Sequence, residues 1–459
     1  MKTWLAHWRS LGERVAFVGS GGAAVSFAEL AQRAEAAVAE GVLADGEAAP
    51  GGAVVAFPIE YSARAVVALL AMARAGAIVV PCERALDMNG AVERLEAAGG
   101  GRVLAWADRD RLATAGIVTG TGERSAALAR LAAAREAGLV LFTGASTGAA
   151  KGVLHRLGAF LDDFALRRGE GRRFLPLMAP DHLGGLDMLL RTMATGTTVV
   201  DPGDRDVRTV CGVIERCRPD IIGGTPALLN LLALAIDGEP GGVRGAEAVR
   251  VVVCGADRLT EGGRTRIARA FPNAVIVSRF GTTETGAVRM AYDTAERCFR
   301  PDGTEQAPVA VRDGELWVRL PRSFAGFLDE AAGRGRIVDG WYRTGDRAEM
   351  TADGSLRILG RSSHVIHVGG EKVMPEVVED VVSQHPDVAW CRAYGEAHVL
   401  MGEVVALDVV WRRPGASALA VKREIDGFAR ERLARHARPV QVRLVETVQL
   451  TPVGKTSRR

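Results

Sequence analysis

The stretch Leu139-Val-Leu-Phe-Thr-Gly-Ala-Ser-Thr-Gly-Ala-Ala-Lys-Gly-Val153 decides the fold of this chain. Its four leading apolar residues predict a short buried strand, and a loop of small and hydroxyl residues follows before Lys151. Small residues let a backbone pass close to a ligand, and their N–H groups and hydroxyls can surround an anion. The loop therefore has two interpretations, a plain turn between a strand and a helix or a polyphosphate site. Thr143, Ser146, Thr147 and Lys151 favour the polyphosphate.

This loop does not have the Walker A pattern G-x-x-x-x-G-K-[ST]. The chain has one Gly-Lys-Thr run, at 454–456, and Gln449 stands where that pattern requires its first glycine. If the loop at 143–152 binds ATP, it must therefore do so in another fold.

Length and composition describe a large globular chain. With 459 residues, of which 48% are hydrophobic and 25% charged, it is long enough for about three compact units around a substantial core. The net charge of +3 is too small to indicate a nucleic acid or an anionic membrane surface as a partner. A monomer and a homodimer are both compatible with the sequence.

The cysteines and the N-terminus bear on the compartment. The six cysteines form no CxxC pair and no metal-ligand spacing, so we expect buried free thiols in a reducing environment. The N-terminal residues lack the apolar core of a signal peptide, and no apolar run is long enough for a transmembrane helix. We therefore expect a cytoplasmic protein without integral membrane association.

Short apolar runs alternate with amphipathic helical patterns up to about residue 300. Val54–Phe57 and Ile78–Val80 predict buried strands, and Ser62–Ala75 predicts a helix between them. Such βαβ units form largely parallel sheets, which predicts an α/β protein. Further strands are predicted at Val25–Phe27, Val103–Ala105, Leu139–Phe142, Thr198–Val200, Ile221–Ile222, Val251–Cys254 and Val275–Val277.

The pattern changes beyond that point. Gly314–Arg319 has two alternating faces, which predicts an antiparallel sheet. We predict a large multi-sheet N-terminal body at residues 1–360 and a smaller, mobile α+β lid domain at 361–459, joined by a short hinge. The elements predicted in this lid are a hairpin-like turn at Gly369-Gly370, the helices Pro375–Gln384 and Ala418–Arg435, and the strand Val404–Val410.

Five more segments follow the glycine- and threonine-rich loop in a fixed order. They are Val252–Asp257, Ser278–Gly286, Gly340–Asp346, Gly360–Pro375 and Leu450–Lys455. Together with the loop they resemble the adenylate-forming superfamily, which contains acyl- and aryl-CoA ligases, peptide-synthetase adenylation domains and luciferases. The resemblance covers nearly the whole chain, with weaker agreement before residue 50, and the pattern is most similar to stand-alone acyl- and aryl-CoA ligases.

This resemblance implies a two-step reaction with ATP, Mg²⁺ and coenzyme A. A carboxylate attacks the α-phosphorus of ATP to give acyl-AMP and pyrophosphate, and a thiol then displaces AMP. The implied substrate is an aromatic or aliphatic carboxylic acid.

The resemblance also assigns roles to residues. The catalytic residues it implies are Lys455, which bridges carboxylate and phosphate from the lid, Thr283 at the α-phosphate, and His182 as a gate of the acyl pocket. Glu284 is the implied Mg²⁺ ligand. Asp346 and Arg361 are placed at the ribose, and Phe280, in place of the family's usual tyrosine, at the adenine. The full set implied to bind ATP or coenzyme A is Thr143, Ser146, Thr147, Gly148, Lys151, Gly255, Ala256, Phe280, Gly281, Asp346, Arg361, Gly369 and Gly370.

Each of these residues also has a plain structural interpretation. Phe280 is otherwise a core aromatic, Asp346 a turn residue, and the glycine pair at 369–370 an ordinary hairpin turn. Lys455 is otherwise part of a basic tail. Asp181 next to the gate resembles the group that binds an α-ammonium in amino-acid adenylation domains, although the run from Pro180 to Leu186 fits acyl and aryl ligases better.

The chain departs from the family pattern at several positions. Gly144-Ala145 stands in place of Ser-Gly, and Ala150 in place of proline, which puts the rate of adenylation in doubt. His364 replaces a common acidic residue and His367 a common lysine.

Three hypotheses remain open at this stage. The first is a carboxylic acid–CoA ligase. The second is an adenylation enzyme that loads an acyl or aminoacyl group onto a separate phosphopantetheinyl carrier protein. The third is a non-catalytic nucleotide-binding relative.

Overall fold

A computed structural model describes residues 2–41, 51–83, 88–108, 110–120, 124–143, 151–239, 241–288, 290–293, 298–301, 308–448 and 451. Contacts between residues divide the chain into two compact units. The first unit comprises Met1–Gly223, Gly281–Ala287 and Leu320–Tyr342, and the second comprises Gly224–Phe280, Val288–Arg319 and Arg343–Arg459. This division does not test the predicted boundary at residue 360, which stays a prediction.

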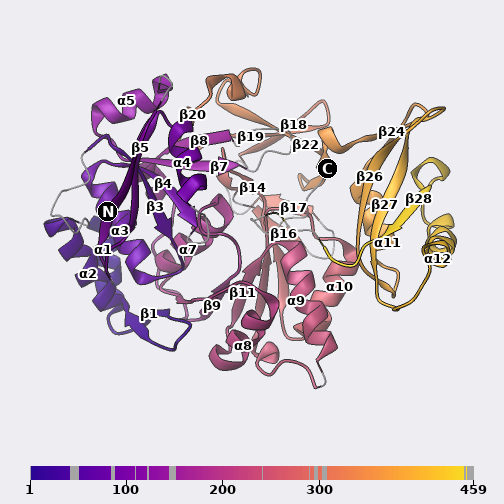
Figure 1. Ribbon diagram of the computed structural model, residues 1–459, viewed down its shortest axis with the longest axis horizontal. Helices are drawn as coiled ribbons and strands as arrows, with labels where there is room; N and C mark the ends of the chain where they lie inside the picture. Colours follow the sequence, from indigo (N-terminus) through magenta and orange to yellow (C-terminus); the bar gives the residue numbers. More distant parts are fainter. Residues whose placement is uncertain are drawn as a thin grey trace. The chain divides into compact units, whose positions relative to one another are not determined.

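The first unit contains a seven-stranded mixed sheet, in the order β20-β8-β7-β4-β3-β5-β6 (Figure 1). Its four central strands pair in parallel, whereas β8, β20 and β6 pair antiparallel at the edges. The parallel centre confirms the α/β prediction. The strands are β3 (Val54–Ile59), β4 (Ile78–Glu83), β5 (Gly100–Trp106), β6 (Leu112–Thr119), β7 (Gly138–Thr143), β8 (Lys151–Arg156) and β20 (Phe324–Phe327).

A second sheet of this unit has the order β11-β9-β10-β1-β2, and it is parallel except for the β1–β2 pair. Its strands are β1 (Val15–Val18), β2 (Ala24–Ser26), β9 (Arg173–Pro176), β10 (Thr198–Val200) and β11 (Ile221–Gly224). The helices of the unit are α1 (Lys2–Leu11), α2 (Phe27–Glu40), α3 (Ala63–Ala75), α4 (Met88–Ala97), α5 (Ala126–Ala134), α6 (Leu157–Asp162), α7 (Leu183–Thr195) and α8 (Val207–Cys217). The short strands β14 (Gly281–Thr282), β15 (Gly286–Ala287) and β21 (Ile337–Val338) complete it.

Helix α3 shows why this unit holds together. Nearly all of its side chains between Ala63 and Met72 are buried, and they share one large core cluster with α1, α2 and α7. Ser62 caps the first turn by accepting from the N–H of Ala65, and Gly76 ends the helix in the left-handed conformation. A helix that is apolar on every side must be enclosed by other elements, as this one is.

The second unit combines a parallel strand pair with an antiparallel sheet. β12 (Val251–Cys254) pairs in parallel with β13 (Val275–Ser278), and α9 (Pro226–Gly238) and α10 (Glu261–Ala270) belong to the same part. The antiparallel sheet has the order β16-β17-β23-β22-β19-β18. Its strands are β16 (Met290–Asp293), β17 (Cys298–Pro301), β18 (Val309–Arg312), β19 (Glu315–Arg319), β22 (Trp341–Met350) and β23 (Leu356–Arg361).

The C-terminal domain of this unit is built on a five-stranded sheet, coloured from orange to yellow in Figure 1. β24 (Ile366–Val368) and β25 (Glu371–Val373) form the hairpin predicted at Gly369-Gly370. α11 (Pro375–Val382) and α12 (Ala418–Arg430) begin where predicted and end earlier, so the two predicted helices were too long. The other strands are β26 (Val388–His398), β27 (Gly402–Trp411) and β28 (Gln441–Leu444).

The loop that decides the fold joins two strands rather than a strand and a helix. β7 and β8 are antiparallel neighbours, with Thr143 opposite Lys151. The plain interpretation of a strand-to-helix turn was therefore wrong. In the described part of the chain, no helix is long and apolar enough to cross a membrane.

Helix α10 docks on the C-terminal domain through a glycine and a buried arginine. The N–H of Gly262 donates to the Ser383 hydroxyl at 3.1 Å, and a Cβ at residue 262 would lie 1.8 Å from the Ser383 carbonyl oxygen. Arg266 is buried; it donates to Asn230 Oδ1 at 2.6 Å and to the Val388 carbonyl at 3.0 Å. Burial is the main cause that lowers the pKa of Arg266, to about 10, so the guanidinium stays charged at neutral pH.

We expect Arg266→Ala to lower the free energy of unfolding by about 3 kcal/mol, because it leaves buried acceptors without donors. Urea unfolding followed by circular dichroism measures the change. Arg269 is an exposed arginine of the same helix, so Arg269→Ala is the control. It should change the free energy of unfolding by less than about 0.5 kcal/mol. Equal effects of the two variants would contradict the importance of the buried contact.

Candidate functional site

A tight turn at 281–287 presents Thr283 and Glu284. β14 and β15 pair antiparallel, and the turn between them is closed by Thr282 and Thr285, each of which donates its backbone N–H to the other's hydroxyl at 3.2 and 3.3 Å. A Cβ at Gly281 would lie 2.5 Å from the Gly286 carbonyl oxygen, so the turn requires glycine there. The geometry fixes Thr283 and Glu284, two of the predicted site residues, at its apex.

Glu284 is buried and held by a tyrosine. The Tyr342 hydroxyl donates to Glu284 Oε1 at 2.6 Å, and it accepts from Arg336 Nη1 at 3.4 Å. Burial, with the Glu284 charge as the next cause, raises the pKa of Tyr342, so the phenol remains a proton donor. Tyr342 lies inside the predicted segment Gly340–Asp346, but no local pattern indicates that its partner is Glu284.

His155 supports the same turn from strand β8. It is fully buried beside Phe160 and Phe324, and its Nε2 lies 2.8 Å from the Thr283 carbonyl oxygen. Burial is the main cause that lowers the pKa of His155, to about 4, so the neutral ring donates its Nε2 proton to that carbonyl. The sequence analysis did not identify this residue. Its one indication was a histidine within the apolar run that directly follows the loop.

The proposed phosphate loop is described only at its two ends. Thr143 closes β7 and Lys151 opens β8, with the Thr143 hydroxyl 3.5 Å from the Lys151 carbonyl oxygen. Ser146, Thr147 and Gly148, together with the unusual Gly144, Ala145 and Ala150, lie outside the described residues. Since β8 carries Lys151 and His155, it connects this loop to the Thr283–Glu284 turn.

The second unit holds the residues predicted for the nucleoside. Asp346 and Arg361 are register partners on β22 and β23, with Arg361 Nε 2.8 Å from Asp346 Oδ1. Burial raises the pKa of Asp346 and the Arg361 charge opposes that rise. Among the described residues, the buried Oδ2 of Asp346 has no hydrogen-bond partner, which leaves it ready to accept one from a ligand hydroxyl.

The other residues predicted to bind the nucleoside differ in exposure. Phe280 is half-buried and packs edge-to-face on Phe299 with ring centroids 6.3 Å apart, so it is partly a core aromatic. Gly255 is buried, and Ala256 is exposed with a φ of +69°, in the left-handed region. A non-glycine residue in that region costs free energy and is often found at ligand sites.

His182 lies at the start of α7, and its neighbour Asp181 is neutralised. Arg94 of α4 donates to Asp181 Oδ2 at 2.9 Å and to the Pro81 carbonyl at 2.7 Å, and the Asp181 side chain is only 3% exposed. His182 Nε2 lies 3.7 Å from Asp181 Oδ1. A carboxylate already paired with a half-buried guanidinium is a poorer partner for the α-ammonium of an amino acid.

Gly369 and Gly370 form the exposed turn between β24 and β25. Both have positive φ values, and the Gly369 N–H donates to the Met401 carbonyl at 2.8 Å. A Cβ at Gly370 would meet nothing within 4 Å. His367 is exposed nearby, and Lys455 lies outside the described residues.

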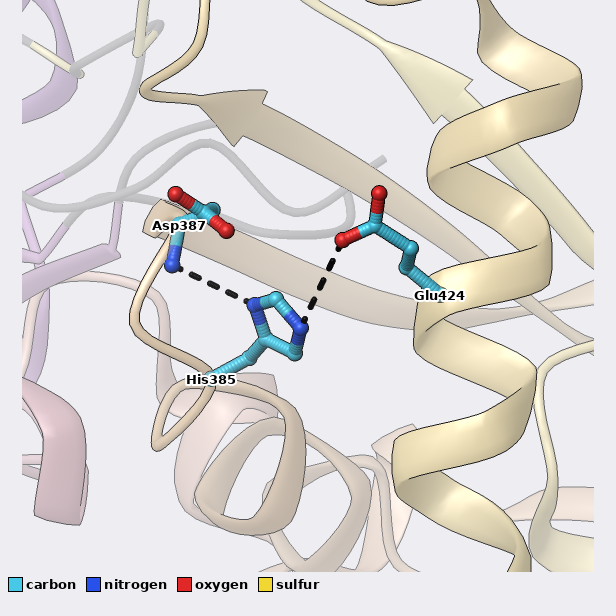
Figure 2. A group of neighbouring side chains, drawn as sticks. All are labelled: His385, Asp387 and Glu424. Atoms are coloured by element: carbon cyan, nitrogen blue, oxygen red, sulfur yellow. Dashed lines mark hydrogen bonds and ion pairs between the residues drawn. The ribbon is translucent and has the colours of Figure 1, made fainter.

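One cluster resembles a metal site without having its chemistry. His385, Asp387 and Glu424 bring ligand atoms together in the C-terminal domain (Figure 2). The Asp387 N–H donates to His385 Nδ1 at 3.2 Å, so the neutral ring carries its proton on Nε2, the nitrogen that faces Glu424. Arg413 contacts both carboxylates. We interpret this cluster as a surface ion-pair group.

The chain matches two family models in sequence order. The AMP-binding enzyme model matches residues 5–328, and the AMP-binding enzyme C-terminal domain model matches residues 377–455. The chain belongs to the AMP-binding enzyme family. The match confirms the family resemblance inferred from the ordered motifs.

Relatives of this family member include ligases of different acids. A 3-[(3aS,4S,7aS)-7a-methyl-1,5-dioxo-octahydro-1H-inden-4-yl]propanoyl:CoA ligase of Mycobacterium tuberculosis is 28% identical over 438 residues, covering 86% of this chain and 85% of the relative. A 2-succinylbenzoate–CoA ligase of Bacillus licheniformis is 27% identical over 339 residues, covering 70% of this chain and 69% of the relative. The antimetabolite synthetase AmbE of Pseudomonas aeruginosa is 30% identical over 437 residues, but these cover only 19% of its length.

Solved structures confirm the fold of this family member. An anthranilate CoA ligase in complex with anthranoyl-AMP superposes with a TM-score of 0.78 at 19% identity, covering 99% of this chain and 95% of that one. An o-succinylbenzoate CoA synthetase from Bacillus subtilis, in complex with its acyl-adenylate, superposes with a TM-score of 0.74 at 22% identity, covering 99% of this chain and 96% of that one. These matches confirm the predicted fold class, a mixed α/β chain with a large N-terminal body and a smaller C-terminal domain.

The buried His155 predicts an acid-sensitive stability. Its pKa is about 4 in the folded protein and near 6.5 when unfolded, so the unfolded chain binds the extra proton between these values. Its contribution to the free energy of unfolding is therefore fully present above pH 6.5 and is lost as the pH falls toward 4. At pH 5 the loss amounts to about 2 kcal/mol.

We expect wild-type protein to lose about 2 kcal/mol more stability than His155→Gln between about pH 7 and about pH 5, as measured by urea unfolding. His367→Gln, which removes an exposed histidine, should keep the wild-type dependence. A His155→Gln variant with an unaltered pH dependence would contradict the neutral, buried state of this ring.

Proposed function

We propose that this protein is an ATP-dependent carboxylic acid–CoA ligase that acts through an acyl-adenylate. In the first step a carboxylate oxygen bonds to the α-phosphorus of ATP, and pyrophosphate leaves. In the second, the thiol of coenzyme A loses its proton and bonds to the acyl carbon, and AMP leaves. The observation that carries the proposal is the braced Thr283–Glu284 turn in a chain with both family domains.

In this proposal the first unit binds the triphosphate. Lys151 and the hydroxyls of Thr143, Ser146 and Thr147 contact the β- and γ-phosphates, and Thr283 contacts the α-phosphate. Glu284 would hold Mg²⁺, because a carboxylate oxygen is the hard ligand that this ion prefers. Bound Mg²⁺ lowers the repulsion between the two anions that react.

The second unit binds the nucleoside and completes catalysis. The unpartnered Oδ2 of Asp346 accepts from a ribose hydroxyl, Arg361 orients that carboxylate, and Phe280 with the Gly255–Ala256 turn contacts the adenine. Lys455 places a cation where negative charge develops, which is worth about 3 kcal/mol of the barrier. Gly369 and Gly370 let the pantetheine arm pass close to the backbone.

Two observations favour an acyl or aryl acid over an amino acid. Arg94 already forms an ion pair with one oxygen of Asp181, the acidic group that an amino-acid site would need here, so an α-ammonium group would have to share that charge. The relatives matched along most of their length are CoA ligases of organic acids. His182 then gates an acyl pocket for an aromatic or aliphatic acid.

A substrate panel tests the proposal. Benzoates and fatty acids are supplied with ATP, Mg²⁺ and coenzyme A, and mass spectrometry follows acyl-AMP, AMP and acyl-CoA. We expect AMP and a thioester in equal amounts for at least one class of acid. Pyrophosphate exchange without thioester, or a thioester formed only on an added holo-carrier protein, would favour the carrier-loading function, and no adenylate with any acid would contradict an enzyme.

Lys151→Ala separates the two steps. We expect ATP–pyrophosphate exchange to fall roughly 100-fold because the phosphates lose a cation, whereas thioester formation from pre-made acyl-AMP changes little. Arg156→Ala, at the exposed end of the same strand, is the matched control and should leave both rates unchanged. Equal losses in the two steps would contradict a role confined to the triphosphate.

A further inference from the structure

We infer that Tyr342 is a positioning residue that determines which oxygen of Glu284 faces the metal ion. This inference rests on the proposed function, because it assumes that Glu284 binds Mg²⁺. It adds to that function a residue that sets metal affinity without contacting the metal or the substrate.

The direction of the hydrogen bonds carries the argument. The Tyr342 hydroxyl accepts from the Arg336 guanidinium, which has no proton acceptor of its own, so the phenolic proton points to Glu284 Oε1 at 2.6 Å. With Oε1 engaged, Glu284 has Oε2 for a cation, and the described residues provide no hydrogen bond to that oxygen. The carboxylate is therefore arranged to bind a metal through one oxygen.

The tyrosine itself is held rigidly. Tyr342 is the second residue of strand β22 and the last residue of the first unit. It is opposite Ile337 of β21, and its buried ring packs with Val153 of β8 and Phe327 of β20. Asp339 and Gly340, both with positive φ, make the turn that joins β21 and β22. The hydroxyl thus comes from a strand and a packed ring, which fixes its position better than a loop would.

This rigidity matters for the metal that the site is proposed to bind. Mg²⁺ requires near-ideal octahedral geometry at short distances, so a carboxylate that rotates freely is a poorer ligand. Removing a group that orients a ligand typically costs 10- to 100-fold in metal affinity. Phenylalanine at position 342 keeps the packed ring and removes only the donor.

Tyr342→Phe tests the inference. We expect the Mg²⁺ concentration for half-maximal ATP–pyrophosphate exchange to rise about 10-fold, with turnover at saturating Mg²⁺ within about threefold of wild type. Electron paramagnetic resonance of free Mn²⁺, in the presence of a non-hydrolysable ATP analogue, measures metal binding independently of turnover. We expect the same weakening there.

Tyr394→Phe is a matched control. Tyr394, in the C-terminal domain, lies in the same kind of hydrogen-bond series from arginine through tyrosine to carboxylate. Its hydroxyl accepts from Arg443 at 2.9 Å and donates to Asp408 at 3.0 Å. Its variant should leave the metal dependence of exchange and the Mn²⁺ affinity unchanged. If Tyr342→Phe does not fold, Arg336→Leu tests the inference instead, because it removes the donor that orients the Tyr342 hydroxyl. We expect it to weaken Mn²⁺ binding by a smaller factor.

Two results would overturn the inference: unchanged Mn²⁺ affinity in folded Tyr342→Phe, or a loss of turnover at every Mg²⁺ concentration without a shift in half-saturation. The second result would assign Tyr342 a purely structural role. The proposed function fails separately, if wild-type protein exchanges pyrophosphate with no acid. In that case the Mn²⁺ measurement alone still decides whether Tyr342 sets the metal affinity of a nucleotide site.

Discussion

A carboxylate buried without a neutralising cation is costly, and the Thr283–Glu284 turn of the first unit carries one. Glu284 is 8% exposed, and its direct hydrogen-bond donor is a neutral phenol rather than a guanidinium. Asp181 and Asp346 differ, because each contacts an arginine at 2.8–2.9 Å. The phenol orders the carboxylate and brings no positive charge of its own to it. Such a group is suited to attract a cation that arrives with a ligand.

The same turn receives support from distant parts of the sequence. His155 holds the Thr283 carbonyl from β8, and Tyr342 holds Glu284 from β22. Both supporting side chains are buried and uncharged at neutral pH because burial shifts the pKa of His155 down and that of Tyr342 up. The apex of the turn is therefore ordered by groups whose own charges do not compete with a bound nucleotide.

The sequence predicted the parts of this arrangement that depend on local pattern. Apolar runs placed β3, β4, β7 and β12 to within a few residues, and the ordered motifs predicted the Asp346–Arg361 region, whose two residues are register partners. It did not predict the strand β8 after the loop, because a short apolar run fits a helix or a strand equally well. It missed His155 as a site residue and Tyr342 as the partner of Glu284, since such contacts depend on packing between segments far apart in the chain.

The glycine at position 262 has a consequence for how this chain can change over evolutionary time. Its missing side chain is what allows helix α10 to touch the Ser383 backbone, and every other amino acid would bring a Cβ to 1.8 Å from that oxygen. Residue 262 thus tolerates no substitution unless helix α10 moves away from Ser383, which caps the C-terminal end of α11. In a deep mutational scan, residue 262 should stand out as intolerant as a catalytic position, although it lies on a docking surface.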